Sequence, residues 1–104
     1  MAEARRLKLH EEFCDLLGSR DVYYRPPESL KMSYPCIRYN PDGFNSLHAD
    51  NRNYKNTQRY SGIVIDPDPD SVIPELLLEH FTMCSIDRAY ASNNLNHFAF
   101  TIYY

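Results

Sequence analysis

The sequence of 104 residues contains no tryptophan, only three glycines and three cysteines, and no apolar run long enough to cross a membrane. Cys14, Cys36 and Cys84 are an odd number without a Cys-x-x-Cys pair, which argues against a disulfide framework and favours reduced thiols in a cytosol. No apolar segment follows the basic residues near the N-terminus, so we expect no secretory signal. These absences together favour a soluble protein made inside the cell.

Motifs that carry catalysis or bind metal are also lacking. There is no Gly-rich nucleotide loop, no GxSxG elbow and no HExxH helix, and the cysteines and histidines lack the usual zinc spacings. His48 and Asp50 could form half of an acid–base pair, but no nucleophile or orienting group accompanies them. The DPDPD run at Asp66–Asp70 would need Gly and Glu at the sixth and twelfth positions of a calcium loop, where Ser71 and Leu77 stand. We expect no enzymatic activity, no metal and no cofactor.

Charge is low in total but unevenly distributed. The formal net charge of −3 argues against a protein held to nucleic acid by its overall field. The basic residues Arg52, Lys55 and Arg59 lie in a stretch without acids. The acidic residues of the following stretch, which has no Lys or Arg, are Asp66, Asp68, Asp70, Glu75 and Glu79. Adjacent blocks of this kind are usually solvated loops, but they would also suit head-to-tail self-association.

The stretch from residue 56 to residue 81 organises the predicted fold. Ile63, Val64 and Ile65 are β-branched residues within a long strand over 56–66, which favours a strand buried on both faces. Prolines at 67 and 69 cannot donate to a sheet and end this strand. Ser71 is then predicted as the N-cap of a helix that reaches about Phe81.

Hydrophobic periodicity predicts the remaining elements. Residues 2–17 have the spacing of an amphipathic helix, and Gly18 is placed to close it. Further strands are predicted at 22–25, 34–40, 84–91 and 96–104, with turns at 41–43 and 92–94 and with Pro35 placed as on an edge strand. Residues 44–55 are polar and aperiodic and are predicted as a long hairpin arm or a poorly ordered loop. The sequence thus predicts one α+β domain of order α-β-β-β-α-β-β, with an antiparallel sheet of about five strands and two helices packed on one face.

Three segments carry a resemblance to a known family: YPCIRYNPDG (34–43), HADNRNYKNTQRYSGIVIDPDPDSVIP (48–74) and CSIDRAYASNNLNHFAFTIYY (84–104). They resemble small virion proteins of tailed bacteriophages of Gram-positive hosts, and the strings IDPDPDS–IP and NNLNHFAF are the most specific parts. Gly62 and Ile63 depart from the family pattern, which has larger or different residues there. Ile86 stands where the pattern has an aromatic residue.

The resemblance implies a neck or tail-completion protein, similar in fold to the tail terminators that cap the tail tube. It implies an α+β subunit that assembles into a hexameric ring in the virion and performs no catalysis, after synthesis in the host bacterial cytoplasm. The expected partners are further copies of this chain, the tail tube protein and the head connector or stopper protein. Neither nucleic-acid specificity nor a membrane is expected.

The motif positions are expected to fix turns and subunit contacts, with Asp87 or Arg88 in an ion pair. The candidate contacts to a neighbouring subunit or to the tail tube are Phe44, Leu47, His48, Asp50, Arg52, Tyr54, Lys55, Arg59, Asp66, Asp68, Asp70, Asp87 and Arg88. The motif also includes Asn94, Asn96 and His97.

Three alternatives remain open at this point. A head-completion stopper or adaptor would act in the same setting. A small cellular ligand-binding or regulatory α+β domain would instead form a dimer with an apolar pocket. An RNA-binding sheet with exposed aromatic residues would show salt-dependent affinity.

Overall fold

A computed structural model of the chain describes residues 2–27, 29–44 and 58–104. Its elements in chain order are α1 (Ala2–Leu17), β1 (Val22–Tyr24), β2 (Cys36–Phe44), β3 (Gln58–Asp66), α2 (Ile73–His80), β4 (Cys84–Ser92) and β5 (Leu95–Tyr103). This order confirms the predicted α-β-β-β-α-β-β succession and the α+β class. Among the described helices, neither α1 nor α2 is long and apolar enough to span a membrane.

The five strands form one sheet in the order β1-β2-β3-β5-β4. The pairs β2–β3, β3–β5 and β4–β5 are antiparallel, whereas β1 pairs with β2 in parallel. The prediction of a purely antiparallel sheet is therefore wrong at β1. The physical reason is the long connection 25–35, which returns the chain to the end of the sheet where β1 starts, as a parallel pair requires.

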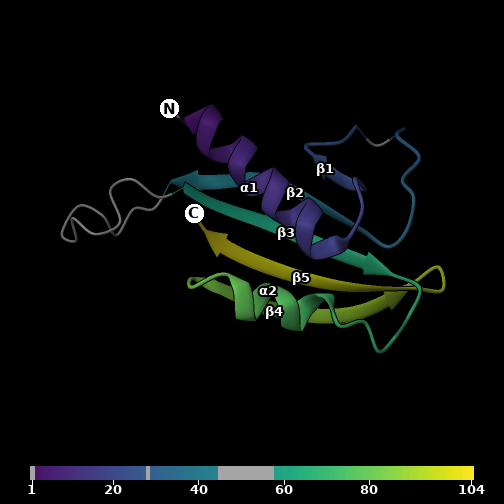
Figure 1. Cartoon of the computed structure of the whole chain (residues 1–104). Helices are drawn as coiled ribbons and strands as arrows, with labels where there is room; N and C mark the ends of the chain where they lie inside the picture. The colour runs from purple at the N-terminus through teal and green to yellow at the C-terminus, as the bar shows by residue number, and fades with distance from the viewer. Residues whose placement is uncertain (1, 28, 45–57) are drawn as a thin grey trace.

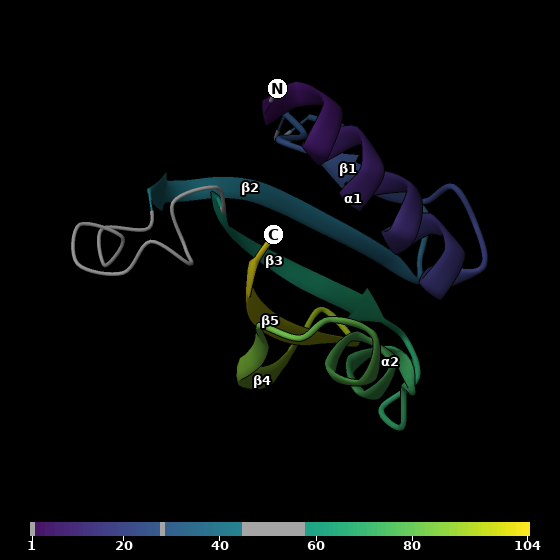
Figure 2. The same ribbon diagram turned by 60° about the vertical axis from the view of Figure 1, so that its left-hand side comes forward.

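Both helices pack on one face of the sheet, as predicted (Figures 1 and 2). One hydrophobic core joins Leu9 and Phe13 of α1 with Leu77 of α2 and with strand residues such as Val64 and Phe100. The two helices also contact each other. We call this side of the sheet the helix face and the opposite side the open face.

The helix α1 follows the predicted periodicity and ends as predicted. Leu9 and Phe13 are completely buried, and Leu16 and Leu17 pack against the core about one turn after Phe13. Gly18 has a φ of 79°, and its N–H donates to the carbonyl oxygen of Cys14 at 2.9 Å. A left-handed glycine that satisfies a free carbonyl is the usual end of a helix, so α1 is terminated by its own sequence.

Aromatic rings dominate the core between α1 and the sheet. The ring of Phe13 packs edge-on against three others: Tyr39 at 5.1 Å, Phe81 at 5.6 Å and Phe100 at 5.8 Å between centroids. Edge-to-face contacts at these distances add to the stabilisation from buried area. Tyr39 in turn contacts the rings of Tyr24 and Tyr60.

Gly62, one of the departures from the family pattern, has a packing role on the helix face. It lies between Tyr39 and Phe100 in the sheet register, and the ring of Phe100 leans over it. A β-carbon at this position would lie 2.4 Å from Cζ of Phe100 and 3.0 Å from the carbonyl oxygen of Arg38. The absence of a side chain here therefore makes room for the ring, a reason for glycine inside a strand.

Two local predictions around β2 are wrong. Residues 41–43 do not form a turn, because β2 continues to Phe44 through a register shift between Pro41 and Phe44. A bulge of this kind tolerates a proline in a strand. Pro35 does not mark an edge strand either: it precedes Cys36, and β2 lies between β1 and β3.

The start of α2 also differs from the prediction. Its N-cap is Val72 rather than Ser71, and the N-cap makes no side-chain hydrogen bond. The Ser71 hydroxyl instead accepts a hydrogen bond at 3.3 Å from the N–H of Ile73, the first residue of α2. Pro74 lies in the first turn, where its missing N–H costs little.

Candidate functional site

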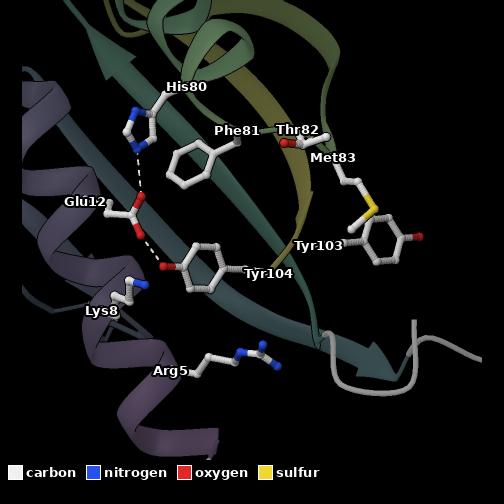
Figure 3. Close-up of a pocket in the computed structure, with 9 residues that line it drawn as sticks. All are labelled: Arg5, Lys8, Glu12, His80, Phe81, Thr82, Met83, Tyr103 and Tyr104. Carbon is white, nitrogen blue, oxygen red and sulfur yellow. Dashed lines mark hydrogen bonds and ion pairs between the residues drawn. The ribbon is translucent and has the colours of Figure 1, made fainter. Parts of the chain in front are cut away.

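A cavity of about 450 Å³ opens where α1, the end of α2 and the end of β5 meet (Figure 3). Its lining residues are Arg5, Lys8, Glu12, His80, Phe81, Thr82, Met83, Tyr103 and Tyr104. Two cations of α1 stand on one side, and apolar and aromatic side chains form the opposite wall. The cavity is thus both charged and apolar, unlike the apolar pocket expected of a ligand-binding dimer.

The carboxylate of Glu12 lines this cavity and joins three elements. Nε2 of His80 donates to Oε1 of Glu12 at 2.7 Å, and the hydroxyl of Tyr104 donates to Oε2. His80 ends α2 and Tyr104 follows β5, so a single side chain of α1 joins both. The ring of Phe81 packs edge-on against His80 at 4.7 Å and against Tyr104 at 6.1 Å, which holds both donors in place.

This network shifts the protonation of its members. Burial opposes the charge of Glu12, but the hydrogen bonds from Tyr104 and His80 outweigh it, so the pKa of the carboxyl lies below its ordinary value. Burial, together with the bond to Glu12, raises the pKa of the Tyr104 phenol to about 12. Glu12 is therefore held ionised and Tyr104 neutral, an arrangement that stabilises helix packing rather than one that transfers a proton at neutral pH.

Metal binding finds no support in the described ranges 2–27, 29–44 and 58–104. No group of three or more His, Cys, Asp or Glu side chains gathers there in a way that could hold a metal ion. The three cysteines are free thiols. Burial raises the pKa of Cys36 and of Cys84 to about 11 each, so neither is a reactive thiolate at neutral pH.

The open face of the sheet is the second candidate region. The register places Arg38, Ile63, Ala99 and Arg88 opposite one another in a row that crosses β2, β3, β5 and β4. We call this set the arginine row. The next row towards the β4–β5 turn contains Cys36, Ile65, His97 and Tyr90. Cys36 and Ile65 are buried although they lie outside the core of the helix face, which confirms that β3 is buried on both faces near its end.

Tyr90, His97 and Arg88 form a stack on this face. The rings of Tyr90 and His97 are 4.8 Å apart and nearly parallel at 9°. The guanidinium carbon of Arg88 lies 4.9 Å from the centroid of the Tyr90 ring. The contacts orient a cation and two rings along β4, and Tyr90 is still 38% exposed.

Several predicted site residues fall outside the part of the chain that the structure describes: Leu47, His48, Asp50, Arg52, Tyr54 and Lys55. Phe44 is the last residue of β2 and pairs with Gln58 in the register. The basic half of the predicted charge pairing is thus represented only by Arg59.

Arg59 is engaged within its own chain. Its Nε donates to the carbonyl oxygen of Asp42 at 2.8 Å and lies 3.4 Å from the Asp42 carboxylate. A hydrogen bond to Tyr103, followed by the nearby Asp42 charge, raises the pKa of Arg59. A neighbouring acidic surface would have to compete with these contacts for the same guanidinium.

Asp66, Asp68 and Asp70 form the rigid turn that the sequence predicts. The carboxylate of Asp66 accepts a hydrogen bond from the N–H of Asp68, and that of Asp68 accepts one from the N–H of Asp70, both at 2.9 Å. The side-chain amide of Asn96 donates to the carbonyl oxygens of Asp66 and Pro67 at 3.2 Å each. The proposed role of these motif positions in fixing turns is therefore confirmed for this turn.

Asp87 and Arg88 lie at a register shift in β4, between the pairs Ile86–Phe100 and Arg88–Ala99. The carboxylate of Asp87 accepts hydrogen bonds from Ser85 at 3.1 Å and Thr101 at 2.6 Å, while Arg88 stacks on a ring. Neither residue forms an ion pair with any described residue. The turn that follows has φ values of 55° and 63° at Asn93 and Asn94, as a tight hairpin with two left-handed residues requires.

Sequence reasoning missed the Glu12 network and the arginine row. Glu12 is separated from His80 by 68 positions and from Tyr104 by 92, so no local pattern joins them. The arginine row follows from strand order, which places β5 between β3 and β4. Finding it from the sequence would have required the correct register across β2, β3, β5 and β4.

No protein-family model, no curated protein and no solved structure matches this chain. The function proposed below rests on the residues of this chain and on the sequence resemblance described above.

Proposed function

We propose that this chain is a structural protein of a tailed bacteriophage, a tail terminator or tail-completion subunit that forms a ring at the head–tail joint. The observation that carries the proposal is the one-sided fold: within the described residues both helices pack on one face of the sheet, no helix covers the open face, and β4 is an edge strand (Figures 1 and 2). A subunit that assembles through its surface needs such uncovered elements.

The edge strand β4 supports the proposal. Every residue from Asp87 to Ser92 is exposed, and among the described strands β4 pairs with β5 alone. An exposed strand edge readily pairs with another chain unless something blunts it. The register shift at Asp87 interrupts the regular edge of β4. This favours a specific contact with another chain over unlimited extension of the sheet.

The surface chemistry also supports an assembly role. Tyr and Arg are enriched at the energetically dominant positions of protein interfaces, and the open face carries both in an ordered stack. The proposed action is mechanical: a ring, expected to be hexameric, caps the growing tail tube and presents a surface to the head connector. It uses no cofactor and no catalytic group, and its expected partners are its own copies, the tube protein and the connector or stopper.

Electron microscopy of the negatively stained protein at low salt tests this proposal. We expect closed rings with a central opening and with the rotational symmetry of six subunits in class averages. Added to a growing tail tube, the same preparation should leave tubes of shorter length with one capped end. Particles limited to monomers and two-fold dimers at every concentration would overturn the proposal and favour the cellular ligand-binding alternative.

A further inference from the structure

We propose that the open face binds the Asp-Pro-Asp-Pro-Asp turn of a second copy, so that the arginine row of one subunit meets the acidic residues of the next. The inference rests on the proposed ring and assigns its subunit interface. In this interface Arg38 and Arg88 form the positive side of the head-to-tail contact, in place of the basic block at 52–59 that the sequence suggested.

The arginine row is positive and has no acidic partner within the described residues. Arg38 and Arg88 make no ion pair there, in contrast to Arg59, which is paired with Asp42, and Arg20, which is paired with Glu11. Strands β3 and β5 lie between the two arginines, so their Cα atoms are separated by about 14 Å. The partly buried Ile63 and Ala99 form an apolar surface between the two arginines.

The acidic turn has matching chemistry. Asp68, Asp70 and Glu75 are exposed carboxylates, and Pro67 and Pro69 are exposed apolar rings between them. In the proposed contact, the carboxylates of the turn pair with the arginines of the neighbouring copy. The proline rings between them pack on Ile63, Ala99 and Tyr90. The hydrogen bonds from Asn96 and within the turn fix its shape before binding, which lowers the entropy cost of docking.

The positions of the arginine row and of the acidic turn on the subunit determine the symmetry of the contact. The turn leads from the end of β3 to α2 on the helix face (Figure 1), whereas the sheet register places the arginines on the opposite, open face. A surface on one side that binds a different surface on the other side of the next copy is a heterologous contact. Such contacts form rings when the rotation closes.

Charge reversal in two separate variants tests this interface. One variant carries Arg38→Glu and Arg88→Glu, and the other carries Asp70→Lys and Glu75→Lys. Asp70 and Glu75 are chosen because neither carboxylate accepts a hydrogen bond within the described turn, so the turn keeps its internal contacts. A matched control reverses two exposed cations in the connection between β1 and β2, Arg25→Glu and Lys31→Glu.

Sedimentation velocity should show each of the two variants as a monomer, with self-association weakened by about 100-fold, while the control assembles like the unmodified chain. An equimolar mixture of the two variants should assemble again, because each reversed surface now meets its reversed counterpart in an alternating ring. Circular dichroism spectra equal to that of the unmodified chain identify variants that are folded.

The outcomes separate this interface from the ring itself. Rings formed by both variants alone would overturn the assigned interface and leave the proposed function standing. An unmodified chain that stays monomeric under all conditions would overturn both. A reversal of Arg38 and Arg88 that leaves assembly intact but abolishes salt-dependent retention on single-stranded DNA would also contradict the interface and assign the face to nucleic acid.

Discussion

The two faces of this sheet are built from alternate residues of the same strands, yet they have opposite character. On the helix face, Val64 and Phe100 are 0% and 1% exposed and contribute to a core of aromatic and aliphatic side chains. On the open face, the neighbouring positions Ile63 and Ala99 are only partly buried and lie between two arginines. The difference indicates that one face stabilises the fold and the other is available for contacts.

Substitutions on the two faces should therefore separate stability from association. Substitutions on the helix face should lower the free energy of unfolding. Substitutions in the arginine row should change that free energy much less and mainly alter the solution mass.

The largest effect is expected from Phe100→Ala on the helix face. Removing a fully buried ring that contacts Phe13 leaves a cavity, and the free energy of unfolding should fall by about 3–5 kcal/mol. Urea unfolding monitored by circular dichroism measures this. Phe98→Ala, on the same strand and face but only partly buried, should cost clearly less; equal costs would contradict the assigned core.

Gly62→Ala is expected to cost about 1–3 kcal/mol, because the new methyl group meets a ring that is packed in the core and cannot swing away freely. A double variant with Phe100→Leu checks the cause. If the clash with the ring is responsible, the double variant should lose less stability than the sum of the two single changes. If the losses of stability of the two single variants simply add in the double variant, the clash with the Phe100 ring is not the cause of the loss in Gly62→Ala.

Glu12→Gln tests the network between α1, α2 and β5 through its pH dependence. The pKa of Glu12 is lowered in the folded protein, so its ionised form contributes stability above the ordinary glutamate pKa of about 4.3, and this contribution is lost as the pH falls through the folded pKa. At neutral pH the variant should lose about 1 kcal/mol. Its free energy of unfolding should also decline less than that of the unmodified chain on acidification.

Glu79→Gln is the control for this pH dependence. Glu79 is exposed on α2 and accepts no hydrogen bond from the described residues. If it changed the acid dependence as much as Glu12→Gln, the loss would be a general charge effect and not a property of the network.

The smallest effect on the fold is expected from the double reversal Arg38→Glu and Arg88→Glu. The main loss is the contact of Arg88 with Tyr90, so the free energy of unfolding measured on dilute protein should change by about 0.5–1 kcal/mol. A loss as large as that of Phe100→Ala would show that the open face is part of the core.

Much of the fold could be predicted from local patterns. The spacing of Leu9 and Phe13 predicted α1, Gly18 predicted its end, and the alternation of Phe98, Phe100 and Ile102 predicted the buried side of β5. These features depend on neighbouring residues and on backbone preferences that the sequence displays directly.

Features that depend on long-range pairing could not be predicted in the same way. The parallel pairing of β1 and the continuation of β2 through Pro41 depend on a connection and a bulge whose geometry is not local. The engagement of Arg59 by Asp42 across 17 positions was likewise not indicated by any local pattern. The alternation of apolar residues along a strand predicts which face is buried but does not indicate what the opposite face binds.

The most direct test of the central claim is the solution mass of the unmodified chain, measured by light scattering at several concentrations and at low and high salt. We predict a mass that rises with concentration towards six times that of the chain, and that falls at high salt because charges contribute to the contact. A mass of one chain under all conditions, or of two chains without further growth, would contradict the proposed ring.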